Sequence, residues 1–459
     1  MVHRHHHRDA RYTATAIAPP RGCSSPKNRN LPSIGVQTSI RLFEPESPPY
    51  RGIIMRPLLI AMACLLSLPA SVFAADITSI SRLAAGPDNV LFVADWKTAE
   101  IHAIELPPAS HKPNGTTFNI LDLEQLLSKQ IGGARVYVED MVVRPGTAEV
   151  YIAVSYGAEK TPSLFVVTSD GKARRVDLST APSTTVVLRD APTSTMKFWK
   201  QTPERSFTVT DMKWRKGELF VAGLSNQDFS STLRRVRYPF DAKQSVTSLE
   251  VFHGGHDQFE TRSPIRAMSF ANLGGKPYLV AAYTCTPLAL IPLDQLKDGA
   301  HVRGKTVAEL GYGNTPADMV SFTRTEQGKT EDFLMLVNFN RVGDVISIPE
   351  LDAALARPGI EKQVPYGQIT GLDMTEAPLA GVMHLDNLDD KSFVVVRRDL
   401  QRDALQLVSM GKGLSFRLTD HVSEYSFPDF SYKGKRPAQE YINMLLKDEN
   451  LPEFIKGPE

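Results

Sequence analysis

A dipeptide that recurs at near-regular intervals constrains the fold of this chain more than any other feature. Asp-Met ends an extended stretch at Asp140, Asp211, Asp318 and Asp373, and Ala267 replaces the aspartate in a fifth copy. The intervals between the copies are 71, 56, 51 and 55 residues. Self-similarity at such a spacing indicates a repeat architecture, in which each unit buries its apolar face against the next.

A strongly apolar, strand-like run follows each copy after a turn, and an earlier unit begins near Ile77. These second runs are Leu91–Ala94, Val150–Val154, Leu219–Ala222, Tyr278–Ala282, Phe333–Val337 and Phe393–Val396. Third runs are Ser163–Val167, Thr232–Val236, Val345–Ile348 and Ala404–Val408, and fourth runs are Ala173–Leu178, Leu249–Phe252, Thr306–Leu310 and Leu414–Leu418. The pattern predicts an all-β fold, a β-propeller of six four-stranded blades, and a seventh blade built from the termini stays open.

The first unit also carries a resemblance to a known repeat. Residues 86–95 read Gly-Pro-Asp-Asn-Val-Leu-Phe-Val-Ala-Asp, a turn followed by an aliphatic–aromatic–Val–small–Asp strand. This resembles the NHL-type propeller repeat. Six-bladed propellers of this kind include the gluconolactonase-like and calcium-dependent phosphotriesterase-like families. The resemblance implies the fold and no specific activity.

The N-terminal region reads as a targeting signal that follows an unrelated segment. Residues 55–74 combine one basic residue, a short apolar run, Pro69 and small residues before Ala75, which is typical of a secretory signal peptide. Its apolar run is about half of the ~20 residues that a membrane span needs. A signal of this type functions at a chain start. We therefore expect translation from Met55, with residues 1–54 either not made or disordered, and cleavage after Ala74.

The rest of the chain divides into a propeller and a tail. The repeats predict a propeller over 75–430, and a tail over 431–459 contains a short helical pattern that Pro437 opens. Residues 122–129 form a second helical candidate. Residues 179–206, rich in Thr, Pro and Ser, predict a surface excursion.

Charge and cysteine content restrict the cellular compartments and the classes of binding partner that we expect. Nine of the 52 basic and three of the 51 acidic residues precede Ala75, which leaves 43 and 48 in the mature body. A mildly acidic body without a basic stripe argues against nucleic acid as a partner. Removal of 1–74 leaves Cys285 as the one cysteine, so no intramolecular disulfide can form. We expect an exported protein, periplasmic or secreted, with no membrane span in the mature chain.

The repeated aspartates have two interpretations. Equivalent inner-strand positions would bring Asp140, Asp211, Asp318 and Asp373 to a similar height around the central channel. Converging carboxylates repel one another unless a cation or protons compensate, and oxygen sets of this kind bind Ca²⁺. Alternatively, each aspartate bonds backbone amides between neighbouring blades. Repetition at nearly every blade favours this structural use, because a ligand site normally breaks symmetry.

Loops that share one face of a propeller form a candidate ligand-binding rim. Connections between blades lie on the same face as the loops between second and third strands. The rim residues that the sequence assigns to this face are Asn226, Asp228, His253, His256, Glu260, Arg262, Tyr283, Cys285, Asn338, Arg341 and Arg397.

Three features of this rim suggest chemistry. His253 and His256 lie close to Glu260, which is typical of a metal site or of acid–base work, or of solvated loop histidines. Cys285, at a strand end, would be a nucleophile if a histidine lay close, and a packing residue otherwise. The arginines suit an anionic ligand, a carboxylated quinone included, or pair with surface carboxylates.

The sequence carries no motif that fixes a reaction. Zinc signatures, a C-x-x-C-H haem motif, a G-x-S-x-G elbow and nucleotide-binding glycine loops are all absent from it. We therefore expect a propeller that recognises a small molecule or a partner protein on its rim, with no catalytic residue assigned. The alternative is a calcium-dependent hydrolase or lactonase at the channel mouth, and behind it a quinoprotein dehydrogenase. Whether the protein is an enzyme stays open.

Overall fold

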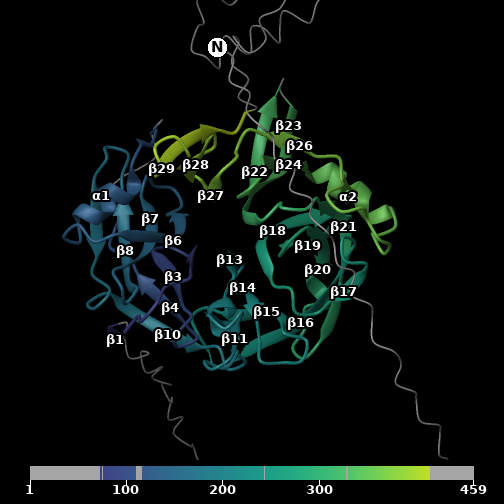
Figure 1. Ribbon diagram of the computed structural model, residues 1–459, viewed down its shortest axis with the longest axis horizontal. Coiled ribbons are helices and arrows are strands. Elements are labelled where there is room, and N and C mark those ends of the chain that lie inside the picture. Colours follow the sequence, from purple (N-terminus) through teal and green to yellow (C-terminus); the bar gives the residue numbers. More distant parts are fainter. Residues whose placement is uncertain (1–72, 75, 110–115, 242, 327–328, 414–459) are drawn as a thin grey trace, which may run out of the picture. The chain divides into compact units, whose positions relative to one another are not determined.

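Antiparallel sheets dominate the structure and form a β-propeller (Figure 1). The computed structural model describes residues 73–74, 76–109, 116–241, 243–326 and 329–413, all within the unit Ser67–Glu459. The predicted all-β propeller class is confirmed. No helix among the described residues is long and apolar enough to cross a membrane.

The inner strands contact one another in a closed ring. In spatial order these strands are β2 (Arg82–Ala85), β6 (Val136–Val143), β27 (Val382–Asn387), β22 (Pro316–Glu326), β18 (Ile265–Leu273) and β13 (Asp211–Arg215), and β13 contacts β2 again. Each strand opens one blade. We number the blades by the sequence order of these strands, so that β2, β6, β13, β18, β22 and β27 open blades 1 to 6.

Blades 2 to 5 are built from strands that follow one another along the chain. Blade 2 continues with β7 (Val150–Tyr156), β8 (Thr161–Val167) and β9 (Ala173–Val176). Blade 3 continues with β14 (Glu218–Leu224), β15 (Ser231–Arg237) and β16 (Gln244–His253). Blade 4 continues with β19 (Lys276–Tyr283), β20 (Pro287–Pro292) and β21 (His301–Leu310). Blade 5 continues with β23 (Lys329–Asn338), β24 (Gly343–Ser347) and β26 (Thr375–Ala377). Strands β16 and β21 pair in parallel and join blades 3 and 4.

Blades 1 and 6 each take an outer strand from a distant part of the chain. In blade 1, β3 (Val90–Asp95) and β4 (Glu100–Glu105) are followed by β10 (Pro182–Val187), to which β1 (Phe73–Ala74) also pairs. In blade 6, β28 (Ser392–Asp399) and β29 (Ala404–Gly411) are followed by β5 (Asn119–Ile120). The chain thus starts in blade 1, crosses to the edge of blade 6, builds blade 2 between them and returns to blade 1. The two exchanged strands link blades 1 and 6 to the segments that precede and follow blade 2 in the sequence.

The apolar second strands are buried on both faces because each blade packs between two others. In β7, Val150, Ile152 and Val154 lie in a core that blade 2 shares with blade 6. Tyr151 and Ala153, which alternate with them, lie in a separate core shared with blade 1. The hydrophobic core of this unit is therefore a series of layers between blades, and this explains the continuous apolar runs in the sequence.

Short helices and hairpins fill the connections. The predicted helix at 122–129 is confirmed as α1 (Leu123–Lys129), and the carboxylate of Asp122 caps it by accepting from Gln125 N at 2.8 Å. A second helix, α2 (Ile348–Ala356), was not predicted; Ser347 caps it. The remaining elements are β11 (Lys197–Phe198), β12 (Thr202–Pro203), η1 (Glu204–Phe207), β17 (Gln258–Glu260), η2 (Leu293–Gln295) and β25 (Ile369–Thr370). The predictions for 1–54, for the helix at 437–446 and its 431–459 tail, and for a strand at Leu414–Leu418 lie outside the described residues, as does nearly all of the 55–74 signal.

Candidate functional site

Polar side chains gather in two places in this unit, and the first group lies on the inner strands. In each blade, one residue of the inner strand pairs with a residue of the second strand, at a position that is equivalent from blade to blade. These equivalent residues are Arg82, Asp140, Asp211, Ala267, Asp318 and His384. In four of the strands the register shifts just before this residue, which is typical of a β-bulge that re-aims a side chain.

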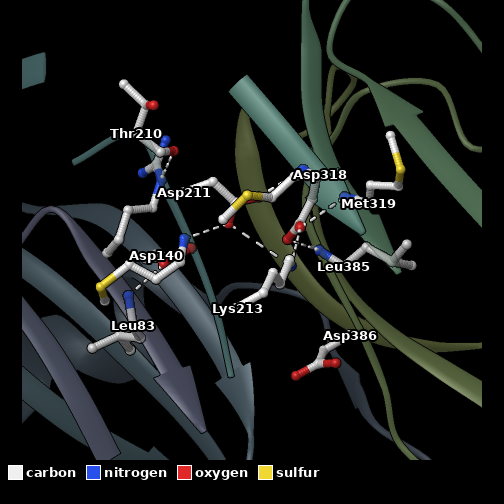
Figure 2. A network of polar contacts seen from close by, with 12 residues as sticks. Leu83, Asp140, Thr210, Asp211, Lys213, Asp318, Met319, Leu385 and Asp386 are labelled. Atoms are coloured by element: carbon white, nitrogen blue, oxygen red, sulfur yellow. Dashed lines mark hydrogen bonds and ion pairs between the residues drawn. The ribbon is translucent and has the colours of Figure 1, made fainter. Parts of the chain in front are cut away.

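Three of the aspartates bond across blade boundaries. Asp140 Oδ2 accepts from Leu83 N at 2.7 Å, and Asp211 Oδ2 accepts from Met268 N at 2.7 Å. Asp318 Oδ2 accepts from Leu385 N at 3.2 Å (Figure 2). In each case the donor is the residue after the equivalent position in the neighbouring blade. The inner-strand carboxylates therefore link adjacent strands of the ring.

Basic groups of the protein compensate these carboxylates. Lys213 Nζ lies 3.2 Å from Asp318 Oδ1 and 3.8 Å from Asp211 Oδ1. His384 Nδ1 lies 3.1 Å from Asp140 Oδ1. Arg82 donates to the carbonyls of Thr210 and Glu139, at 2.6 and 3.2 Å. We call Arg82, Asp140, Asp211, Lys213, Asp318, His384 and Asp386 the axial cluster.

Burial and charge shift the proton affinities in this cluster. Burial raises the pKa of Asp211 to about 7, although the Lys213 charge lowers it. Burial likewise raises the pKa of Asp386 to about 6. The carboxylates of Asp211 and Asp318 raise the pKa of Lys213, which outweighs its burial. Lys213 is therefore the firmly charged cation at the centre of the cluster. The predicted calcium site at the aspartates stays a prediction.

The fourth repeated aspartate lies elsewhere. Asp373 is exposed and precedes β26, the short outer strand of blade 5, so it is not on an inner strand. The cause is the insertion of α2 and its long connection before that outer strand. The inner strand of blade 6 comes next, and His384 there takes the position that the sequence pattern assigned to Asp373.

The second group lies where loops of blades 3, 4 and 5 meet. His253 ends β16, Glu260 ends β17, and Cys285 lies between β19 and β20. One ligand atom from each of His253, His256 and Cys285 lies within 4.8 Å of the others. We call this site, with Glu309, Tyr312 and Tyr366, the rim pocket.

Hydrogen bonds fix both imidazoles of the rim pocket. Glu260 Oε1 accepts from His253 Nδ1 at 3.0 Å and from His256 Nδ1 at 2.6 Å. The two rings stack with centroids 3.8 Å apart. On the other side, His253 Nε2 lies 2.8 Å from the Thr286 hydroxyl, which donates to Glu309. His253 is therefore held at both nitrogens, whereas Nε2 of His256 has no hydrogen-bond partner among the described residues.

The environment favours charge on His253 and Glu260. Burial lowers the pKa of His253, but its contacts with Cys285, Glu260 and Glu309 outweigh burial and bring it to about 9. Burial raises the pKa of Glu260, but the two histidines outweigh it and bring it to about 2. At neutral pH the free pocket thus contains an imidazolium–carboxylate pair beside a thiol.

A small cavity opens beside these groups. Its volume is about 20 Å³, room for about one water molecule, and its walls include Gly255, Gly311, Val364 and the two tyrosines. Tyr312 and Tyr366 are 59% and 66% exposed, and their rings contact each other with centroids 4.2 Å apart and an interplanar angle of 32°. Cys285 adopts a φ of +78°, which is strained for a residue with a Cβ and is typical of functional positions.

The structure brings some of the predicted rim residues together and separates others. His253, His256, Glu260 and Cys285 converge. Arg262 donates to the Asp228 carbonyl at 3.2 Å on the exposed surface. Outside the convergent set, Asn226 is exposed, Arg341 donates to the Leu310 carbonyl, and Arg397 bonds Gln406.

Two predicted rim residues are buried. Tyr283 is 0% exposed within the core of blades 3 and 4, so its side chain presents no surface. Asn338 is also 0% exposed and bonds Asp344, Asn314 and a backbone carbonyl. Their position at strand ends suggested exposure, but the ends of these second strands still lie between blades.

Sequence reasoning missed the partners that complete both groups. Thr286, Glu309 and Tyr366 belong to the rim pocket, and no motif spacing connects them. Lys213 could have been found, because it follows Asp211 by two residues on the same strand and so points to the same face. Arg82 and His384 each precede a leucine at the point where other blades have Asp-Met.

Comparison with known proteins assigns this chain to no family. No family model matches the chain, and no curated protein matches it. Among solved structures, the PQQ-bound aldose sugar dehydrogenase of Streptomyces coelicolor is 10% identical, with a TM-score of 0.30 over 74% of this chain and 95% of that one. The dihydro-heme d1 dehydrogenase NirN is 11% identical, with a TM-score of 0.27 over 75% of this chain and 59% of that one. The present chain thus spans about three-fifths of NirN. Similarity at this level carries no argument about activity.

Proposed function

We propose that this protein is an exported β-propeller that recognises a small molecule in the rim pocket. One observation carries the proposal: loops of three blades converge there on a small hollow that combines polar groups with exposed aromatic rings. Small-molecule sites are typically concave, with few polar groups and an aromatic lining.

The chemistry of the walls suggests the kind of ligand. Tyr312 and Tyr366 are exposed, and either ring offers an apolar face to an aromatic ring or a sugar. His256, 47% exposed in its side chain, offers a polar end group beside it. We infer a small ligand with one flat face and one polar end. The axial cluster supports this choice of site, because its carboxylates already have basic partners.

A thermal-shift screen of monosaccharides and aromatic carboxylates against the full chain tests the proposal. A true ligand at 100 times its Kd should stabilise the protein by about 2.7 kcal/mol. The stabilisation should disappear in Tyr366→Ala and persist in Tyr137→Ala, a control that removes an exposed tyrosine from β6. Ligands that stabilise Tyr366→Ala as well as the wild type would contradict the proposal.

A thiol hydrolase is a second candidate, because Cys285, His253 and Glu260 lie together in the rim pocket. A thiol beside an imidazole that a carboxylate orients is the arrangement of a nucleophile and its base. In that case Cys285→Ser should abolish hydrolysis of activated esters, while His256→Ala should leave it nearly unchanged, since a triad uses one histidine. The calcium-dependent, quinoprotein and NHL-type interpretations stay predictions without support from the rim pocket.

A further inference from the structure

The rim pocket contains one histidine more than a nucleophile and base require. His256 lies against His253, shares its carboxylate partner, and has its ligand atom within 4.8 Å of Cys285 and His253. Two imidazoles and a thiolate are a ligand set that suits borderline transition ions, zinc above all.

Glu260 holds the two histidines as metal sites hold their ligands. A ligating histidine almost always donates its second ring N–H to a carboxylate or carbonyl, which fixes the ring and leaves the other nitrogen for the ion. Here a single oxygen, Glu260 Oε1, accepts from Nδ1 of both rings. Nε2 is therefore the nitrogen of each ring that can reach an ion, and on His253 it contacts the Thr286 hydroxyl in the free pocket.

We propose that His253, His256 and Cys285 bind a divalent transition ion of the zinc class, with a fourth coordination position open to the cavity of the rim pocket. The inference rests on the proposed function and deepens it, because the ion would hold the polar end of the ligand. Three protein ligands and one open position are the pattern of zinc sites that bind exchangeable groups.

Binding requires a local exchange of partners that the structure permits. The ion displaces the proton on Nε2 of His253 and the thiol proton of Cys285, so two protons are released and the ligands are two neutral imidazoles and one thiolate. His253 Nε2 gives up its contact with the Thr286 hydroxyl. Thr286 keeps its bond to Glu309, so no buried hydroxyl is left without a partner.

Titration of the full exported chain with CoCl₂ and ZnCl₂ tests the proposal. We expect one Co²⁺ per chain with a thiolate-to-cobalt absorption band, and displacement of Co²⁺ by Zn²⁺. Cys285→Ser should lose the band, and His256→Ala should weaken binding at least tenfold. Glu260→Gln keeps the three ligands but loses the shared acceptor, and should weaken binding by about 10–100-fold.

His301→Ala is the matched control. His301 Nε2 bonds Glu250 at 3.1 Å, an imidazole–carboxylate pair of the same blades outside the pocket. This variant should bind Co²⁺ like the wild type, and circular dichroism of the metal-free variants checks their fold. Wild-type protein without the thiolate band, or with the band intact in His256→Ala, would overturn the proposal. So would alkylation of Cys285 by iodoacetamide at the same rate with and without Zn²⁺.

The two proposals can fail separately. Tyr366→Ala keeps all three ligands, so it should bind Co²⁺ while losing small-molecule stabilisation. Small-molecule binding in protein that takes up no Co²⁺ would refute the metal site and leave the proposed function. Normal Co²⁺ binding without any small-molecule ligand would refute the proposed function.

Discussion

The axial cluster and the rim pocket both contain carboxylates and histidines, but these side chains do different things in the two places. Carboxylates of the axial cluster sit at positions that the repeat makes equivalent, and each of Asp140, Asp211 and Asp318 bonds a neighbouring strand. The rim pocket occurs at one junction, and its histidine and cysteine have no counterpart at the other junctions in the part of the chain that the structure describes. Repeated polar residues here fasten the ring, whereas the unrepeated ones bring reactive atoms together beside a cavity.

The two groups should also have opposite effects on the stability of the fold. Residues of the axial cluster satisfy buried backbone donors and one another's charge, so their removal should destabilise the fold. In the rim pocket, Cys285 has a φ of +78°, a conformation that costs stability. Backbone strain of this kind is typical of functional positions, so its place beside the cavity favours a functional role for Cys285.

The largest effect should come from breaking the axial charge balance. Lys213→Met leaves Asp211 and Asp318 without their cation, and loss of one partner from a buried ion network typically costs about 3–5 kcal/mol. Urea unfolding of the variant measures this loss. Lys172→Met removes a lysine that is 83% exposed beside Asp170, and should leave the unfolding midpoint unchanged. Similar midpoints for both variants would show that the axial cluster does not depend on Lys213.

Replacement of single aspartates should have smaller effects. Asn in place of Asp140, Asp211 or Asp318 keeps the shape but weakens a bond to the neighbouring blade, at about 1–3 kcal/mol per site. Asp373→Asn, in the exposed copy of the same dipeptide, should have no measurable effect. Thermal melts with and without calcium measure these losses. A loss confined to calcium-containing buffer would favour the predicted calcium site over structural bonding.

The axial cluster should also show a pH dependence of defined sign. The folded-state pKa of Asp211, at about 7, lies above the ordinary value of 3.8. Between these two values the folded state binds more protons than the unfolded state, so this group's contribution to stability falls as pH rises from about 4 to about 7. The slope is at most about 1.4 kcal/mol per pH unit for one group. Urea midpoints should therefore fall more steeply over this range in the wild type than in Asp211→Asn, and parallel profiles would contradict the assignment.

The smallest change in stability should occur in the rim pocket. Cys285→Gly relieves the positive φ but adds freedom to the unfolded chain, so the free energy of unfolding should rise by about 1 kcal/mol or less. The same variant should lose Co²⁺ binding completely. Differential scanning calorimetry and cobalt absorption measure the two effects on one sample. A large destabilisation would identify Cys285 as a packing residue.

The sequence predicts repeated features of this molecule better than unique ones. The apolar second strands were found because burial on both faces leaves an unbroken run, as in Val150–Val154. Asp373 was misplaced because the α2 insertion lengthens blade 5, and sequence spacing does not reveal which strand follows an insertion. Strand β5 has only two residues, and the partners of both exchanged strands, β5 and β10, are distant in sequence.

The site was predictable only in part. The rule that blade connections share a face with the second loops brought His253, His256, Glu260 and Cys285 into one list, and they do converge. The same rule failed for Tyr283 and Asn338, because it fixes the height of a residue and not its burial. Glu309 and Tyr366 depend on how three blades pack together, which local sequence does not encode.

The most direct test of the central claim, that chemistry lies in the rim pocket and not at the axis, is to locate a bound ion. Crystals of the full chain grown with Zn²⁺ would be measured on both sides of the zinc absorption edge. We expect one anomalous peak at about 2.3 Å from Cys285 Sγ and about 2.0–2.1 Å from the two imidazoles, with none among Asp140, Asp211 and Asp318. A peak held by the axial carboxylates, or no peak beside Cys285, would contradict it.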